Sequence, residues 1–225
     1  MGDVQRLIAF DLDGTLIDSR RDLAESANQV ITELGGTPLP EDAIGRMVGE
    51  GAAVLVKRAL AAAGLGDVPG GLPRFLEIYD GRLTKHTRAY EGIEDAVEAA
   101  RLVARVIVLT NKPSGPSERI LSALGLLSLF DEVIGGDGPY PRKPDPASLV
   151  AAIGRAGTTA AHTLLIGDSA IDHETAVRAS SRCCLATYGF GYVMFPNERL
   201  TGKEWIAASP ADLPAIFDRF TAAAG

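Results

Sequence analysis

Residues 7–16 read Leu7-Ile8-Ala9-Phe10-Asp11-Leu12-Asp13-Gly14-Thr15-Leu16, and this stretch decides the fold. A short apolar run, of the length of a buried strand, ends directly in two carboxylates and a glycine. Ligands of parallel α/β sheets gather at the carboxyl ends of the strands, so Asp11 and Asp13 stand where chemistry is expected. Paired carboxylates suit a hard cation such as Mg²⁺, and one of them can also act as a nucleophile. A bare Asp-x-Asp is more often an Asx-turn, so this interpretation needs support from the rest of the chain.

Composition and charge exclude several classes of protein. The chain has 225 residues, 46% of them hydrophobic, which is enough for one α/β domain with a smaller inserted domain. Acidic residues outnumber basic ones 29 to 22, and no Lys/Arg-rich run is present, which argues against nucleic-acid binding. Because the sequence shows neither a signal-peptide pattern nor an apolar run of about 18 residues, we expect no membrane association and a cytoplasmic location.

The two cysteines, Cys183 and Cys184, are adjacent within an apolar run. Neighbouring strand residues point to opposite faces, so we predict that no disulfide joins them. Two free thiols are typical of a reducing cytoplasm. Neither their spacing nor their number indicates a zinc site.

Alternating apolar runs and helical patterns in the second part of the chain predict the main domain. The strand-like runs are Val106–Leu109, Asp131–Ile134, Thr163–Ile166 and Cys184–Tyr188. Continuous apolar strands that alternate with helices indicate a parallel sheet covered on both faces. Residues 18–87, in contrast, carry only helical patterns. We therefore predict an α/β fold, with a doubly wound parallel sheet formed by residues 1–17 and 88–225 and a helical insert at residues 18–87.

Polar side chains stand at the ends of four predicted strands. They are Asp11 with Asp13, Thr110 with Asn111, Lys143, and Asp168 with Asp172. Because the carboxyl ends of parallel strands meet at one edge, these side chains are expected to converge. Carboxylates that hold Mg²⁺, a hydroxyl and an amide that donate to phosphate, and a lysine that offsets negative charge form a set for phosphoryl transfer. Each group alone could be only a turn, a solvated lysine or a helix cap, but their combined order favours a site.

The order of these motifs resembles that of a known family. The motifs are Asp11-Leu12-Asp13-Gly14-Thr15, Thr110-Asn111-Lys112, Lys143-Pro144-Asp145-Pro146 and Gly167-Asp168-Ser169-x-x-Asp172. They resemble the four motifs of the haloacid dehalogenase-like (HAD) phosphatases, which implies a Rossmann-like core, and the helical insert resembles the family's cap domain. Gly49-Glu50-Gly51 and Val108–Pro113 are similar to the phosphoglycolate phosphatases of this family. Arg178–Arg182 lacks a glycine often found there, and Tyr188–Tyr192 is only near the usual form of that subgroup.

The resemblance implies a role for each motif residue. Asp11 attacks phosphorus and becomes an aspartyl phosphate, while Asp13 protonates the leaving alcohol and later activates water. The metal site comprises Asp11, Asp168 and the main-chain carbonyl of Asp13, with Asp172 in support. The phosphate oxygens are held by Thr110 and Asn111, and Lys143 orients Asp11 and offsets charge. An alkoxide is a poor leaving group at neutral pH, so an acid beside the nucleophile favours cleavage of phosphate esters over loss of halide.

We therefore expect a Mg²⁺-dependent phosphatase of a small phosphorylated metabolite, with 2-phosphoglycolate as the best single substrate, acting as a monomer or homodimer. The alternatives are a pyrophosphatase, a sugar phosphomutase or another small-ester phosphatase of the family, or a non-catalytic binding module on the same fold. Every candidate substrate shares the phosphate, so the cap must distinguish among them. We predict that the loop Gly45–Glu50 reaches over the site and that Arg46 pairs with the substrate carboxylate. The alternative for Arg46 is a solvated charge at a helix end.

Overall fold

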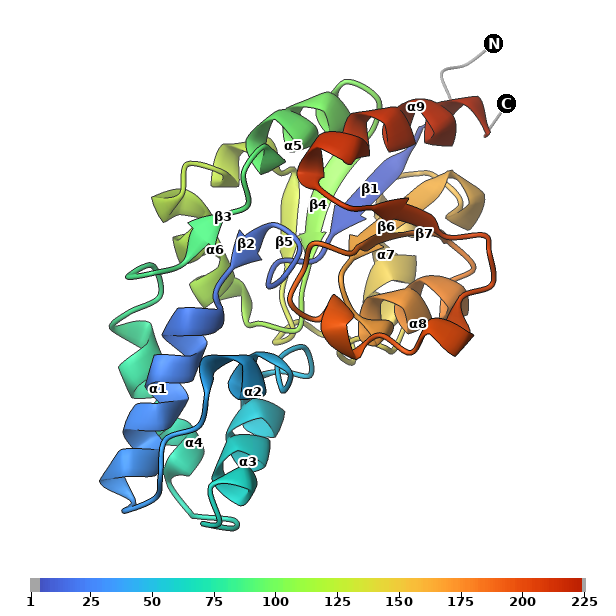
Figure 1. Ribbon diagram of the computed structural model, residues 1–225. Helices are drawn as coiled ribbons and strands as arrows, with labels where there is room; N and C mark the ends of the chain where they lie inside the picture. The colour runs from blue at the N-terminus through green and yellow to red at the C-terminus, as the bar shows by residue number, and fades with distance from the viewer. Residues whose placement is uncertain (1–4, 224–225) are drawn as a thin grey trace.

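A six-stranded parallel sheet forms the centre of the computed structural model, which describes residues 5–223 (Figure 1). Its order is β5-β4-β1-β6-β7-β8. The strands are β1 (Leu7–Phe10), β4 (Arg105–Leu109), β5 (Glu132–Ile134), β6 (Thr163–Gly167), β7 (Arg182–Ala186) and β8 (Trp205–Ala207). Because β1 pairs with β4 on one side and β6 on the other, the residues that follow β1 stand at the centre of the sheet edge.

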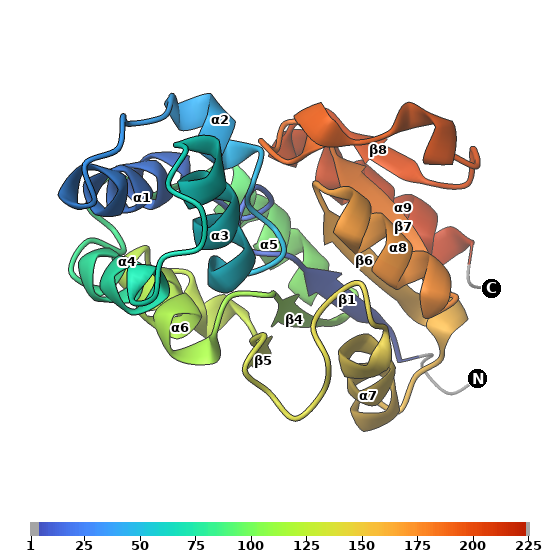
Figure 2. The same ribbon diagram turned by 90° about the horizontal axis from the view of Figure 1, so that it is seen from below.

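Helices cover both faces of the sheet (Figures 1 and 2). One face packs against α5 (Ile93–Arg101), α6 (Ser114–Ala123) and α9 (Leu213–Ala222), and the other against α7 (Ala147–Arg155) and α8 (Ala170–Arg178). Side chains of β1 pack on both faces of the sheet, since Ile8 and Phe10 belong to the first apolar cluster and Leu7 and Ala9 to the second. The predicted doubly wound α/β fold is confirmed.

Four helices pack on one another beside the carboxyl edge of the sheet (Figure 1). This helical group consists of α1 (Arg20–Glu33), α2 (Glu41–Gly45), α3 (Ala52–Ala62) and α4 (Gly71–Asp80). Two short antiparallel strands, β2 (Ile17–Asp18) and β3 (Arg88–Ala89), lie side by side where the chain leaves the sheet and returns to it. The domain boundaries at 17/18 and 87/88 stay a prediction. Residues 1–4 and 224–225, assigned to the core by that prediction, lie outside the described residues.

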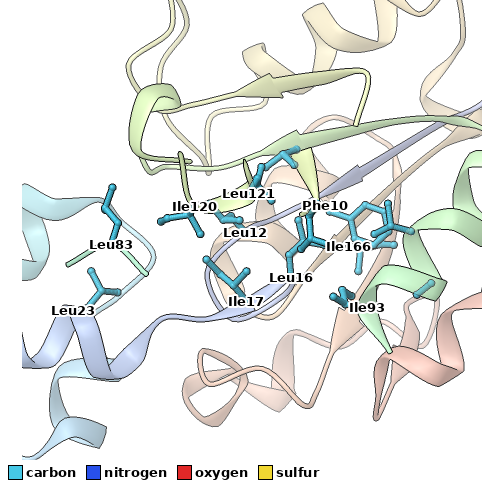
Figure 3. Close-up of a cluster of buried hydrophobic side chains, with 14 of the residues drawn as sticks. Phe10, Leu12, Leu16, Ile17, Leu23, Leu83, Ile93, Ile120, Leu121 and Ile166 are labelled. Atoms are coloured by element: carbon cyan, nitrogen blue, oxygen red, sulfur yellow. The ribbon is translucent and has the colours of Figure 1, made fainter. Parts of the chain in front are cut away.

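A continuous apolar cluster joins the sheet to the helical group (Figure 3). The residues labelled there are Phe10, Leu12, Leu16, Ile17, Leu23, Leu83, Ile93, Ile120, Leu121 and Ile166. Burying an apolar side chain of this size stabilises the fold by roughly 1.5–3 kcal/mol. Because Phe10 and Leu12 are fully buried on either side of Asp11, packing fixes the direction in which that carboxylate points.

The cysteines agree with the sequence analysis. Both thiols are free and buried, and the two side chains belong to the apolar clusters on opposite faces of the sheet. The prediction that they form no disulfide is confirmed. Among the helices formed by residues 5–223, none is long and apolar enough to cross a bilayer.

Candidate active site

Three buried carboxylates meet at the carboxyl edge of the sheet. Asp11 follows β1, Asp168 follows β6, and Asp172 lies in the first turn of α8. One oxygen of each lies within 4.8 Å of the others. The predicted convergence of strand ends therefore places three acids in one small volume, which is costly unless a cation or protons offset their charge.

Lys143 balances part of this charge. Its Nζ lies 2.8 Å from Asp11 Oδ1 and 2.6 Å from Asp172 Oδ1. The other Asp172 oxygen accepts a 2.6 Å hydrogen bond from Ser169 Oγ, and the same two residues form the capping box that begins α8. Asp172 is thus occupied on both oxygens, and its position holds Lys143 against Asp11.

Lys143 compensates the negative charge of the three acids only in part. Burial raises the pKa of Asp11 to about 7, the Asp172 charge adds to that rise, and Lys143 opposes it. Burial, together with the Asp172 and Asp11 charges, raises the pKa of Asp168 well above its usual value. Both shifts mean that the cluster is short of positive charge, which a bound cation would supply.

Glycines allow two loops to approach Asp168 closely. A Cβ on Gly14 would lie 1.8 Å from Asp168 Oδ2, and one on Gly189 would lie 2.5 Å from the same atom. The Gly191 main-chain N–H donates to that oxygen at 2.7 Å. The loops after β1 and β7 approach Asp168 this closely because they carry no side chains there. The fit of a metal is therefore good: the donors are all oxygens, they are buried, and backbone fixes their direction.

The Asp13 carboxylate does not join the three acids and faces the helical group. Its Oδ2 lies 2.8 Å from Lys112 Nζ, and its Oδ1 accepts hydrogen bonds from Lys112 Nζ at 2.9 Å and Ser19 Oγ at 2.5 Å. Lys112 Nζ also donates to the hydroxyl of Tyr79, a residue of α4, at 2.8 Å. Burial alone would lower the pKa of Lys112, but the Asp13 charge and the Tyr79 hydroxyl outweigh burial and raise it.

Thr110 and Asn111 directly follow β4 at the same edge of the sheet. Thr110 Oγ1 accepts a 3.2 Å hydrogen bond from the Lys112 N–H, which leaves its own hydrogen for another acceptor. Asn111 Nδ2 donates to the main-chain oxygens of Gly49 at 2.8 Å and Lys143 at 2.9 Å. Its buried Oδ1 has no partner among the described residues. The predicted donation from Asn111 to phosphate stays a prediction, since both amide hydrogens here hold loops together.

A cavity of about 70 Å³ lies between the sheet edge and the helical group. Its polar wall comprises Asp11, Asp13, Thr110, Asn111, Lys112 and Tyr79, and its apolar wall includes Leu55, Phe75, Leu76, Pro113 and Pro116. Val48 and Gly49 also line it, so the loop Gly45–Glu50 does reach the site. Arg46 belongs to the same loop. It is exposed at the end of α2 and lies outside the cavity wall.

Two of these residues, Lys112 and Tyr79, have no role predicted from the sequence. Lys112 stands in the second quoted motif, directly after Thr110 and Asn111, so a charged residue at a strand end was a usable signal. Tyr79 carried no such signal, because an aromatic residue four positions after Phe75 is typical of an ordinary helical core. The two rings stack within α4, with centroids 5.7 Å apart.

The haloacid dehalogenase-like hydrolase family matches residues 8–186. A phosphoglycolate phosphatase of Cereibacter sphaeroides is 40% identical over 190 residues, covering 81% of this chain and 85% of that protein. One from Rhodospirillum rubrum is 40% identical over 196 residues, covering 82% and 80%. The crystal structure of a predicted phosphoglycolate phosphatase from Haemophilus somnus superposes with a TM-score of 0.87 at 30% identity, covering 94% of this chain and 97% of that one.

Proposed function

The chain belongs to the haloacid dehalogenase-like hydrolase family, and we propose that it is a phosphatase that hydrolyses 2-phosphoglycolate with the help of Mg²⁺. The observation that carries this proposal is that two acids only two residues apart have different surroundings. Asp11 lies with Lys143 in the acid cluster, whereas Asp13 faces the cavity on the other side. A phosphate ester held between them meets a nucleophile at phosphorus and an acid at its leaving oxygen.

Each residue has a place in this reaction. Asp11 Oδ2, which has no lysine partner, attacks phosphorus, while Lys143 fixes Oδ1 and offsets negative charge on the phosphate. The Thr110 hydroxyl donates to a phosphate oxygen. Asp13 gives its proton to the departing alcohol, and after the alcohol leaves it takes a proton from the water that hydrolyses the aspartyl phosphate.

A divalent cation fits the acid cluster. Asp11, Asp168 and the main-chain carbonyl of Asp13 would hold it, with Asp172 in support through its bond to Lys143. Bound there, Mg²⁺ would offset the charges of the acids and of the phosphate. The all-oxygen donor set supports Mg²⁺ over softer metals.

The size of the cavity supports a small substrate. About 70 Å³ is well below the roughly 300–1,000 Å³ of pockets that take drug-sized ligands. The portion of 2-phosphoglycolate beyond the phosphate is a two-carbon acid, whereas a sugar phosphate brings a whole ring. The names of the relatives at 40% identity point the same way.

A panel of phosphate compounds tests the proposal. Phosphate release is measured from 2-phosphoglycolate, p-nitrophenyl phosphate, a hexose phosphate and pyrophosphate, with Mg²⁺ and after chelation. We expect the highest kcat/KM for 2-phosphoglycolate and loss of activity on chelation. A higher value for pyrophosphate or the hexose phosphate would overturn the substrate assignment, and absence of turnover on all four would favour the non-catalytic alternative.

A further inference from the structure

Lys112 is the one cationic residue among the described residues that line the cavity. Its side chain is only 7% exposed and lies on the side of the site that faces the helical group. Lys143, by comparison, is committed to Asp11 and Asp172 at the sheet edge. Any anionic group on a substrate beyond the phosphate would therefore meet Lys112 first.

The pairing of Lys112 with Asp13 cannot persist unchanged through the proposed reaction. Both Asp13 oxygens are occupied, Oδ2 by Lys112 and Oδ1 by Lys112 and Ser19. An acid that hands a proton to a leaving alcohol needs an oxygen within reach of that alcohol. Release of Lys112 from Asp13 Oδ2 would provide it, and a second anion is the natural new partner for the ammonium group.

Tyr79 supplies a second donor at the same place. Its hydroxyl accepts from Lys112 Nζ, and within residues 5–223 the hydroxyl hydrogen has no acceptor of its own. The phenol is buried and lines the cavity. A buried donor without an acceptor costs free energy that a ligand oxygen would recover. An ammonium and a phenol O–H side by side can each bind one oxygen of a carboxylate.

We propose that Lys112 and Tyr79 form the subsite that binds the carboxylate of the substrate, and that Lys112 moves from Asp13 to this carboxylate when substrate binds. The inference rests on the proposed function and specifies its substrate class as short phosphorylated hydroxy acids. The apolar wall formed by Leu55, Phe75 and Leu76 limits the length of the acid. A substrate with a neutral end would leave Lys112 on Asp13, so binding of the correct acid also frees the proton donor.

A pair of matched esters tests this proposal. The substrates are 2-phosphoglycolate and 2-hydroxyethyl phosphate, which has nearly the same size but no carboxylate. The readout is the ratio of their kcat/KM values, so any general loss caused by disturbing Asp13 cancels. In Lys112→Met we expect this ratio to fall about 30-fold or more, as for loss of a buried charge pair. Lys57→Met, which removes an exposed lysine of α3, should leave the ratio unchanged.

Tyr79→Phe provides a second test of the subsite in case Lys112→Met does not fold. It removes only the hydroxyl, and we expect the ratio to fall about 5- to 10-fold. Folding is checked by circular dichroism and by the inhibition constant of inorganic phosphate. An unchanged ratio in a folded variant at either position would overturn the subsite. Failure of the wild type to hydrolyse either ester would instead overturn the proposed function.

Discussion

The two lysines of the site divide it into two regions of different character. Lys143 lies between two buried acids of the sheet edge, Asp11 directly after β1 and Asp172 in the first turn of α8. Lys112 bridges one acid of the core and a tyrosine of α4, so its partners come from both sides of the cavity. The first arrangement is buried at the sheet edge and suits a group that every substrate shares. The second joins the sheet edge to the helical group, and it suits a group that distinguishes substrates.

Replacement of Asp11, the proposed nucleophile, should have the largest effect, and it should affect only the sheet-edge region. Asp11→Asn keeps the shape of the side chain, but the amide is a far weaker nucleophile, so we expect turnover to fall on the order of 10⁴-fold or more. The phosphate released is measured after the reaction is stopped, and circular dichroism is the control for folding. Ordinary turnover by a folded variant would exclude Asp11 as the attacking group.

Loss of the hydrogen bonds that connect the two regions should have the next largest effect, which is on the free energy of unfolding. Asp22, at the start of α1, is fully buried, and its Oδ2 accepts from the N–H groups of His86 and Thr87, each at 2.8 Å, and from Thr87 Oγ1 at 2.9 Å. These bonds fix the segment that returns to the sheet. Asp22→Ala leaves the donors buried without an acceptor, so we expect the free energy of unfolding to fall by about 3 kcal/mol.

Glu25→Ala is the matched control for that variant. Glu25 lies one turn further along α1 and pairs with Arg21 and Arg82, but its side chain is 37% exposed. Arg82 is only 13% exposed, but the Glu25 end of both pairs is open to solvent, so we expect their loss to cost about 0–1 kcal/mol. Urea denaturation of both variants separates the two cases. Equal losses would mean that burial of Asp22 has no special importance for the connection.

The pH dependence of stability distinguishes the sheet-edge acids from other carboxylates. The pKa of Asp11 is about 7 in the folded metal-free protein, against about 3.9 in an unfolded chain. The folded state therefore keeps a proton that the unfolded state loses, and the free energy of unfolding falls as pH rises from about 4 to about 7. Between about pH 5 and pH 7 this amounts to on the order of 2 kcal/mol.

Saturating Mg²⁺ should reverse that slope, because a carboxylate must lose its proton to bind a cation. Thermal denaturation between about pH 5 and pH 8, with chelator and with Mg²⁺, provides the measurement. Asp11→Asn should make the metal-free curve less steep, since the variant carries no titrating group at this position and only the raised pKa of Asp168 remains. Parallel curves with and without Mg²⁺ would argue against a metal among these acids.

The fold could be read from the sequence where packing alone determines it. Continuous apolar strands ending in polar residues predicted the sheet and the convergence of Asp11, Asp168 and Lys143, because parallel strands bring their carboxyl ends to one edge. Strand β8 and helix α2 were missed. Each is shorter than the window over which periodicity is visible, and β8 depends on its pairing with β7.

The helical half of the site could not be predicted in the same way. Tyr79 and Gly49 reach the cavity only through the packing of α3 and α4 beside the sheet, and their contacts with Lys112 and Asn111 span 33 and 62 positions of sequence. No local pattern encodes such distances. The partner of the Asp13 carboxylate was missed for the same reason, since Lys112 lies 99 positions away.

Arg46→Ala should have the smallest effect, and it sharpens the contrast between the regions. Sequence analysis predicted that Arg46 binds the substrate carboxylate, yet in the structure it is exposed and lies outside the cavity wall. An exposed arginine contributes about 0–1 kcal/mol, so we expect kcat/KM for 2-phosphoglycolate to change by less than about fivefold. The same measurement on 2-hydroxyethyl phosphate provides the control. A selective loss of about 30-fold for the acid would mean that the loop Gly45–Glu50 moves to bring Arg46 onto the substrate, and would assign to Arg46 the part that we give to Lys112.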